Sequence, residues 1–215
     1  MNFLAHTALA LDAGGVWACQ DEEIEGLLAG AIIGDFVKGR IPEDWPDPLR
    51  AGVALHRKID ALSNLHPAIQ TACRTYPDDL RRFAPIFLDL LADHSLARSW
   101  SDYYDVEIGG LTKACYEATD SYNRRHKDGA VSANATRFVA YMQDVDLLAN
   151  YNDWHHIEQG IRSVVRRLKK DLDLTHVLTH CAERVGETDV LLQQLYPDLR
   201  SAFTEWNAFD VISAR

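Results

Sequence analysis

The sequence predicts an all-α protein, and three observations support this fold class. Apolar residues recur at helical spacing along most of the chain, whereas the alternating runs that are typical of strands are scarce. No Asn-Gly or Asp-Gly turn lies between such alternating runs, so hairpins are not indicated. The chain has no internal repeat, low-complexity tract or Gly/Ser-rich linker, which favours one compact helical bundle over residues 1–215.

Local signals place the helix boundaries. Gly14-Gly15 is expected to end the first helix, and a glycine with three prolines makes a loop within 39–48. Pro67 and Pro77 mark helix ends, and Asp128-Gly129 separates two later helices. Helices are predicted near 2–11, 22–38, 47–64, 66–75, 78–100, 109–126, 132–149, 153–171, 174–194 and 197–207.

Composition limits the possible functions. The formal net charge of −10 argues against a general nucleic-acid-binding surface. No apolar run reaches the roughly 18 residues of a membrane span, and no Lys or Arg precedes Lys38, so the basic start of a signal peptide is missing. The four cysteines form no CxxC pair and are expected to be reduced thiols in a cytoplasmic protein.

Polar residues on apolar helix stripes are the informative feature. Asp35 ends the apolar face of the second predicted helix, and His56 and Asp60 share an apolar face of the third. His6 lies among apolar residues of the first helix. In the fifth helix, Asp93 continues an apolar stripe.

Two further polar residues lie close to Asp93 in the same helix. His94 is adjacent to it, and Asp89 lies four positions before it.

These residues predict either a metal site or a network of ion pairs. Buried carboxylates cost several kcal/mol or more unless a positive charge compensates them. Imidazole nitrogens and carboxylate oxygens suit Mn, Fe or Zn, or Mg with fewer imidazoles. Helical bundles build such sites from side chains that point inward from facing helices. Arginines such as Arg57 and Arg98 are the alternative partners, and this pattern alone does not decide between the two.

The same segments resemble the acyl carrier protein phosphodiesterases. The matching motifs follow the family's order within roughly the first hundred residues: MNFLAH at 1–6, GAIIGDFVKGR at 30–40, LHRKID at 55–60, HP at 66–67 and APIFLDLLADHSLARSW at 84–100. One departure is Asn64, which stands where the family has an acid and cannot supply charge.

The resemblance implies a function. Family members remove 4'-phosphopantetheine from holo acyl carrier protein, require a divalent metal, typically Mn, and are distant relatives of the helical HD-type phosphohydrolases. An HD-phosphohydrolase-like bundle with holo acyl carrier protein as its partner is therefore expected. The matching positions are His6, Asp35, His56, Arg57, Asp60, Asp93 and His94.

Roles within this set are our hypothesis. The predicted metal ligands are His6, Asp35, His56, Asp93 and His94. Asp60 is a candidate base or supporting carboxylate, and Asp89 is expected to support it. Arg57 and Lys38 are candidates for holding the negative charge of the diester.

An acidic carrier protein needs a basic docking surface on an acidic enzyme. Two basic groups are candidates: Arg40, Arg50, Arg57 and Lys58 beside the predicted site, and Arg162, Arg166, Arg167, Lys169 and Lys170 on one helix. Two other functions stay open, a phosphohydrolase of nucleotides or small diesters and a non-catalytic helical module whose acids pair with arginines.

Overall fold

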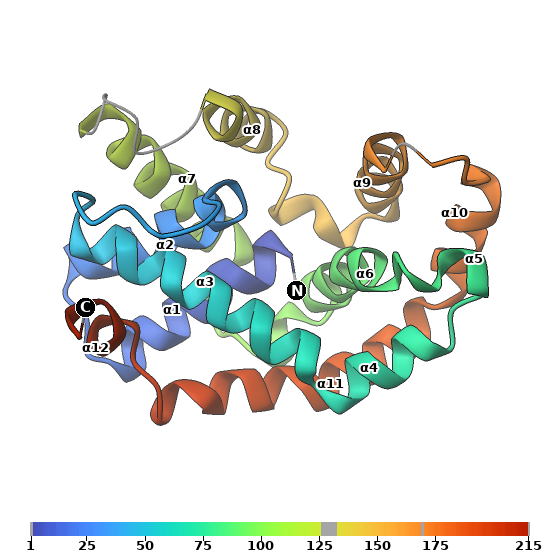
Figure 1. Cartoon of the computed structure of the whole chain (residues 1–215), viewed down its shortest axis with the longest axis horizontal. Coiled ribbons are helices and arrows are strands. Elements are labelled where there is room, and N and C mark those ends of the chain that lie inside the picture. The colour runs from blue at the N-terminus through green and yellow to red at the C-terminus, as the bar shows by residue number, and fades with distance from the viewer. Residues whose placement is uncertain (1, 126–132, 169, 215) are drawn as a thin grey trace.

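The structure is a computed structural model and describes residues 2–125, 133–168 and 170–214 (Figure 1). Within these residues the chain forms helices and loops without a strand, which confirms the all-α prediction. The α-helices are Phe3–Val16 (α1), Asp21–Ile33 (α2), Asp47–Leu65 (α3), Pro67–Arg74 (α4), Asp78–Arg81 (α5), Ala84–Arg98 (α6), Ile108–Arg125 (α7), Ala133–Asp144 (α8), Trp154–Arg167 (α9), Leu174–Glu183 (α10), Val185–Ser201 (α11) and Ala208–Ser213 (α12). The 3-10 helices are Gly34–Phe36 (η1), Trp100–Asp102 (η2), Ala149–Asn152 (η3) and Ala202–Thr204 (η4).

The centre of the bundle is α2, which packs against α1, α3 and α7. Every residue from Gly26 to Ile33 is buried, and ten residues of α1 are buried as well. A helix that is apolar on all sides is stable only when neighbours cover all of its faces. Because α1 and α2 are enclosed in this way, the polar residues that they and η1 carry are held in fixed positions.

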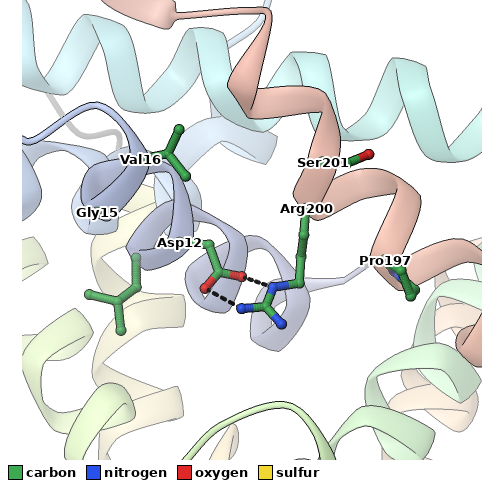
Figure 2. A pocket seen from close by; sticks show the side chains of 7 residues that line it. Asp12, Gly15, Val16, Pro197, Arg200 and Ser201 are labelled. Carbon is green, nitrogen blue, oxygen red and sulfur yellow. Dashed lines mark hydrogen bonds and ion pairs between the residues drawn. The ribbon is translucent and has the colours of Figure 1, made fainter.

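The long helix α11 runs along one edge of the molecule, beneath α3 and α4 in Figure 1. It packs mainly on α6 and also touches α1. Figure 2 shows one α1–α11 contact, in which Arg200 forms a two-pronged ion pair with Asp12, with Nε 2.8 Å from Oδ2 and Nη2 3.3 Å from Oδ1. Tyr104 donates a hydrogen bond to the same carboxylate at 2.8 Å. This network and the open pocket beside it lie at the end of α1 opposite to His6.

Several predicted boundaries were wrong. Helix α1 continues through Gly14-Gly15 because Gly14 packs against α2, and it ends only before Ala18, whose φ is 54°. The helix predicted at 78–100 is split, because Pro85 occupies the first turn of a new helix, α6. The gap predicted between the helices at 174–194 and 197–207 does not occur, because α11 continues through Pro197. Apolar residues on both sides of this proline pack into the core, and their burial offsets its cost of about 3 kcal/mol.

No helix in the described part of the chain is long and apolar enough to cross a membrane.

The α2–α3 contact depends on glycine. A Cβ atom on Gly30 would lie 2.5 Å from the Cα atom of Gly52, well inside the van der Waals limit. The two backbones therefore meet directly, and this close approach sets the position of α3 and of the two polar residues, His56 and Asp60, that it carries.

We therefore expect Gly30→Ala to destabilise the protein by about 1–3 kcal/mol or more, because the added methyl group must separate α2 from α3. The matched control is Gly186→Ala in α11, where a Cβ atom meets nothing within 4 Å. This control should be neutral or stabilising by up to about 1 kcal/mol. Chemical denaturation measures both values, and equal effects would contradict a close contact between the two helices.

Candidate functional site

Four of the predicted residues meet in one cluster, which we call the imidazole–carboxylate cluster: His6 of α1, Asp35 of η1, and His56 and Asp60 of α3. His6 Nε2 lies 3.1 Å from Asp60 Oδ1, and His56 Nε2 lies 3.4 Å from Asp60 Oδ2. Asp35 Oδ1 lies 3.5 Å from the same nitrogen of His56. Three elements thus place two imidazoles and two carboxylates around one point.

The two imidazoles are buried and stacked. Their ring centroids are 4.0 Å apart with an angle of 25° between the planes. Gly34 makes room for the stack, since a Cβ atom there would lie 2.6 Å from His56 Cδ2. The carboxylates form the outer side of the cluster, because the Asp35 and Asp60 side chains are 50% and 40% exposed. The cluster is therefore walled by protein behind the imidazoles and is open to solvent at the carboxylates.

Backbone carbonyl groups orient both imidazoles. His6 Nδ1 donates to Asn2 O at 2.7 Å, and His56 Nδ1 donates to Ala31 O at 3.0 Å. A ring nitrogen beside a carbonyl oxygen must carry a hydrogen, so the neutral form of each ring has its lone pair on Nε2. Both Nε2 atoms consequently point their lone pairs at the carboxylates. A backbone acceptor behind each imidazole is the arrangement that metal-binding histidines commonly have.

This arrangement places hydrogen-bond acceptors against each other. A carboxylate only accepts hydrogen bonds, and an Nε2 lone pair does the same. His6 Nε2 is buried and lacks a hydrogen-bond partner among the described residues, although Asp60 Oδ1 lies 3.1 Å away. Two facing acceptors repel unless a proton or a cation lies between them. The cluster is therefore built around a positive charge.

The pKa shifts reflect the same constraint. Burial lowers the pKa of His56, but the carboxylates of Asp35 and Asp60 outweigh it and raise this pKa to about 9. Burial and the nearby charge of His56 lower the pKa of His6. Burial raises the pKa of Asp35 and Asp60, but hydrogen bonding to His56 and the charges of the two imidazoles reverse this and lower both. Without a bound cation, one proton on His56 offsets two carboxylates, which leaves the cluster negative.

The donor set fits a divalent cation. Ligand atoms of His6, His56 and Asp60 all lie within 4.8 Å of one another. Two ligands that each lie about 2.0–2.2 Å from an ion are separated by about 3–4 Å, so small adjustments suffice. The nitrogen and oxygen donors match Mn, Fe or Zn. The Nε2 of His6, which has no hydrogen-bond partner among the described residues, is the donor atom that such an ion would satisfy.

Asp93 was predicted as a metal ligand, but the structure gives it another position. Its Oδ2 accepts a hydrogen bond from Leu4 N at 2.7 Å, and its Oδ1 accepts from Asn2 N and Ala5 N at 3.2 Å each. Burial raises the pKa of Asp93 to about 7 against the lowering effect of these donors. A carboxylate at a helix N-terminus satisfies unpaired N–H groups. Asp93 therefore positions α1, and with it His6, and lies outside the cluster.

His94 also lies outside the cluster. Its Nδ1 donates to Tyr151 O of η3 at 2.7 Å, and its ring meets the edge of Trp154 with centroids 5.7 Å apart. Burial lowers its pKa. These contacts join α6 to η3 and α9, so the geometry supports a structural role for His94 rather than the predicted metal ligation.

The remaining predicted residues lie around the cluster. Burial and the charges of Asp60 and Asp35 raise the pKa of Asp89, so its carboxyl group interacts electrostatically with both carboxylates. Arg57 Nη2 donates to Val37 O at 2.9 Å and thereby fastens the segment that follows η1. Lys38 is exposed in that segment. Their predicted roles toward a diester stay predictions.

The two basic groups are partly neutralised. Arg40 and Arg50 each pair with an acid three positions away in the sequence, and Arg162 pairs with an acid four positions before it. Lys169 lies outside the described residues. The docking surface for an acidic protein accordingly remains a prediction.

Gly34 was not among the residues predicted for the site. A glycine between an apolar helix and Asp35 was visible within the GAIIGDF segment, but its closeness to His56 was not. Only the crossing of α2 and α3 brings the two residues together.

Comparisons with known proteins agree with the resemblance seen in the sequence. The family model described as acyl carrier protein phosphodiesterase matches residues 1–199. A protein of that name from Escherichia coli O45:K1 is 40% identical over 171 residues, which cover 78% of this chain and 79% of that protein. A second, from Pectobacterium atrosepticum, is 39% identical over 100 residues, 46% of each chain. No solved structure matches the chain.

The matched region includes α1, η1, α3 and α6, which carry the imidazole–carboxylate cluster and the carboxylate that positions His6. The chain belongs to the acyl carrier protein phosphodiesterase family.

Proposed function

We propose that the protein is a metal-dependent phosphodiesterase that hydrolyses the bond between 4'-phosphopantetheine and the serine of holo acyl carrier protein. Membership of the family supports the reaction and the substrate. The observation that carries the metal dependence is the buried Nε2 of His6, which faces a carboxylate and has no hydrogen-bond partner among the described residues. The four free cysteines are consistent with action in the cytoplasm.

We assign the residues by their burial and orientation. His6, His56 and Asp60 would hold the cation, because their donor atoms converge and the imidazoles are fixed by backbone carbonyls. Asp60 thus changes from the predicted base to a ligand. A divalent ion bound there would supply Lewis-acid polarisation of the phosphoryl oxygen and a more acidic bound water. Asp35, the more exposed carboxylate, is placed at the outer side to ligate the ion or to accept the proton of the attacking water.

The positive side chains near Asp35 complete the proposal. Arg57 uses one of its N–H groups for Val37 O and keeps others for a phosphate oxygen. Lys38 is exposed on the same segment and lacks an ion-pair partner among the described residues. Both would orient the diester and offset its charge.

The contacts argue against the non-catalytic alternative. That alternative requires Asp35 and Asp60 to pair with arginines, whereas both carboxylates face imidazoles.

The reaction itself is tested by mass spectrometry. Holo acyl carrier protein incubated with the protein and Mn²⁺ should lose the mass of phosphopantetheine and yield the apo form. Prior treatment with a chelator should abolish the loss, and renewed Mn²⁺ should restore it. An unchanged holo mass under all conditions would refute the proposed function, and full activity after chelation would refute the metal dependence.

Substitutions of Asp60 and Asp35 are expected to differ in their effects on metal binding and on the reaction rate. Asp60→Asn removes a charged ligand and is expected to weaken Mn²⁺ binding at least about tenfold, together with activity. Asp35→Asn is expected to retain a bound ion and lose about 10²–10⁴-fold in kcat, if Asp35 takes the proton. Titration calorimetry measures binding and steady-state assays measure the rate. Asp35→Asn protein that loses the ion completely would reassign Asp35 as an essential ligand.

Gly34→Ala tests whether the His56 ring must occupy its observed place. The methyl group would collide with the ring, so we expect Mn²⁺ affinity and kcat/KM to fall at least about tenfold. Gly110→Ala in α7, where a Cβ atom meets nothing within 4 Å, is the matched control and should keep both values. Unaltered metal binding in Gly34→Ala protein would show that the stacked imidazoles are not needed for the site.

A further inference from the structure

Four aromatic side chains pack together from α8 and from the two elements that carry His6 and Asp35: Phe3 of α1, Phe36 of η1, and Phe138 and Tyr141 of α8. Phe138 is the centre of this group, with ring centroids 5.2 Å from Phe3, 5.7 Å from Phe36 and 6.4 Å from Tyr141. We call these four residues the aromatic wall. Three separate elements contribute to it, and these ring contacts link α8 to α1 and η1.

Two residues of the aromatic wall are close in sequence to residues of the cluster. Phe36 directly follows Asp35 in η1, and Phe3 lies one turn before His6 on the same side of α1. The backbone segments that place the acid and the imidazole therefore also place two of the aromatic rings. We therefore expect the atoms next to a phosphorus bound at the cluster to meet these rings.

The wall is only partly covered. Helix α8 buries Ala135, Val139 and Met142 in the core, while Phe138 and Tyr141 lie on an adjacent face. Tyr141 is 51% exposed, and Phe36 and Phe138 are half-buried. Aromatic rings that remain in contact with water next to a reactive site are typical of ligand contacts.

We propose that the aromatic wall binds the pantetheine arm of the substrate and makes Phe138 and Tyr141 specificity-determining residues. This inference rests on the proposed function. The arm begins at the phosphate with a carbon chain that carries two methyl groups, so its apolar part follows the scissile group directly. The wall is uncharged, which suits a neutral arm and does not complement an acidic protein surface. The arm is therefore the occupant, and the carrier protein itself binds elsewhere.

Two chromogenic diesters test the proposal, because they differ only in the arm: the p-nitrophenyl ester of 4'-phosphopantetheine and methyl p-nitrophenyl phosphate. In both, water attacks phosphorus, the P–O(aryl) bond breaks, and p-nitrophenolate leaves with the bonding electrons while the water proton passes to the base or to solvent. The products are phosphopantetheine or methyl phosphate. The aryl group takes the place of the carrier-protein serine, so the arm alone meets the wall.

Phe138→Ala and Tyr141→Ala should each lower kcat/KM for the pantetheine ester about tenfold more than for the methyl ester, mainly through KM. Phe209→Ala, which removes an equally half-buried phenyl ring at Trp17, is the matched control and should leave the ratio unchanged. Tyr141 is exposed, so its variant keeps the test valid where Phe138→Ala fails to fold. Phe138→Leu, which keeps an apolar side chain, should show an intermediate loss.

Equal losses on the two diesters would overturn the proposal. A loss seen with intact holo acyl carrier protein but not with the pantetheine ester would also overturn it, because the wall would then contact the protein. Failure of the proposed function looks different: the unaltered protein with Mn²⁺ would release no phosphopantetheine from holo acyl carrier protein.

Discussion

The site depends on the opposition of hydrogen-bond acceptors inside a helical bundle. On each neutral imidazole the single N–H group donates a hydrogen bond to a backbone carbonyl. His6 and His56 therefore direct their Nε2 lone pairs toward Asp35 and Asp60. Such an arrangement is unfavourable by itself and becomes favourable around a positive charge. The fold holds it in place because residues 3–10 of α1, which include His6, and residues 26–33 of α2, which precede Asp35, are buried.

Several interactions outside the cluster serve this one arrangement. Asp93 accepts hydrogen bonds from three backbone N–H groups at the start of α1 and so fixes the position of His6 in the bundle. The backbone contact between Gly30 and Gly52 sets the position of α3. Gly34 leaves the space in which the two rings stack. Each of these residues acts by positioning a member of the cluster, which explains why a cluster of four residues depends on so much of residues 1–100.

The proposed cation site and the proposed contact with the pantetheine arm lie in different parts of the same fold. The buried imidazoles and the half-exposed carboxylates are suited to an ion at the bottom of the site and a diester above it. The proposed arm contact comes from α8, which lies far along the chain from α1 and η1 and contacts them through Phe3 and Phe36. Substitutions in α8 are therefore expected to change the proposed specificity without moving His6, His56 or Asp60.

The sequence alone determined the helical class and the candidates His6, Asp35, His56 and Asp60, because helical periodicity shows which polar residues share a face with apolar ones. Periodicity does not show which neighbour that face meets. Asp93 follows the same pattern, yet only the packing of α6 against α1 shows that its carboxylate accepts backbone N–H groups at the start of α1. Likewise, α11 continues through Pro197 because the burial of its apolar residues outweighs the local cost of a proline. The aromatic wall at Phe138 joins residues that are far apart in the sequence, so no local pattern predicts it.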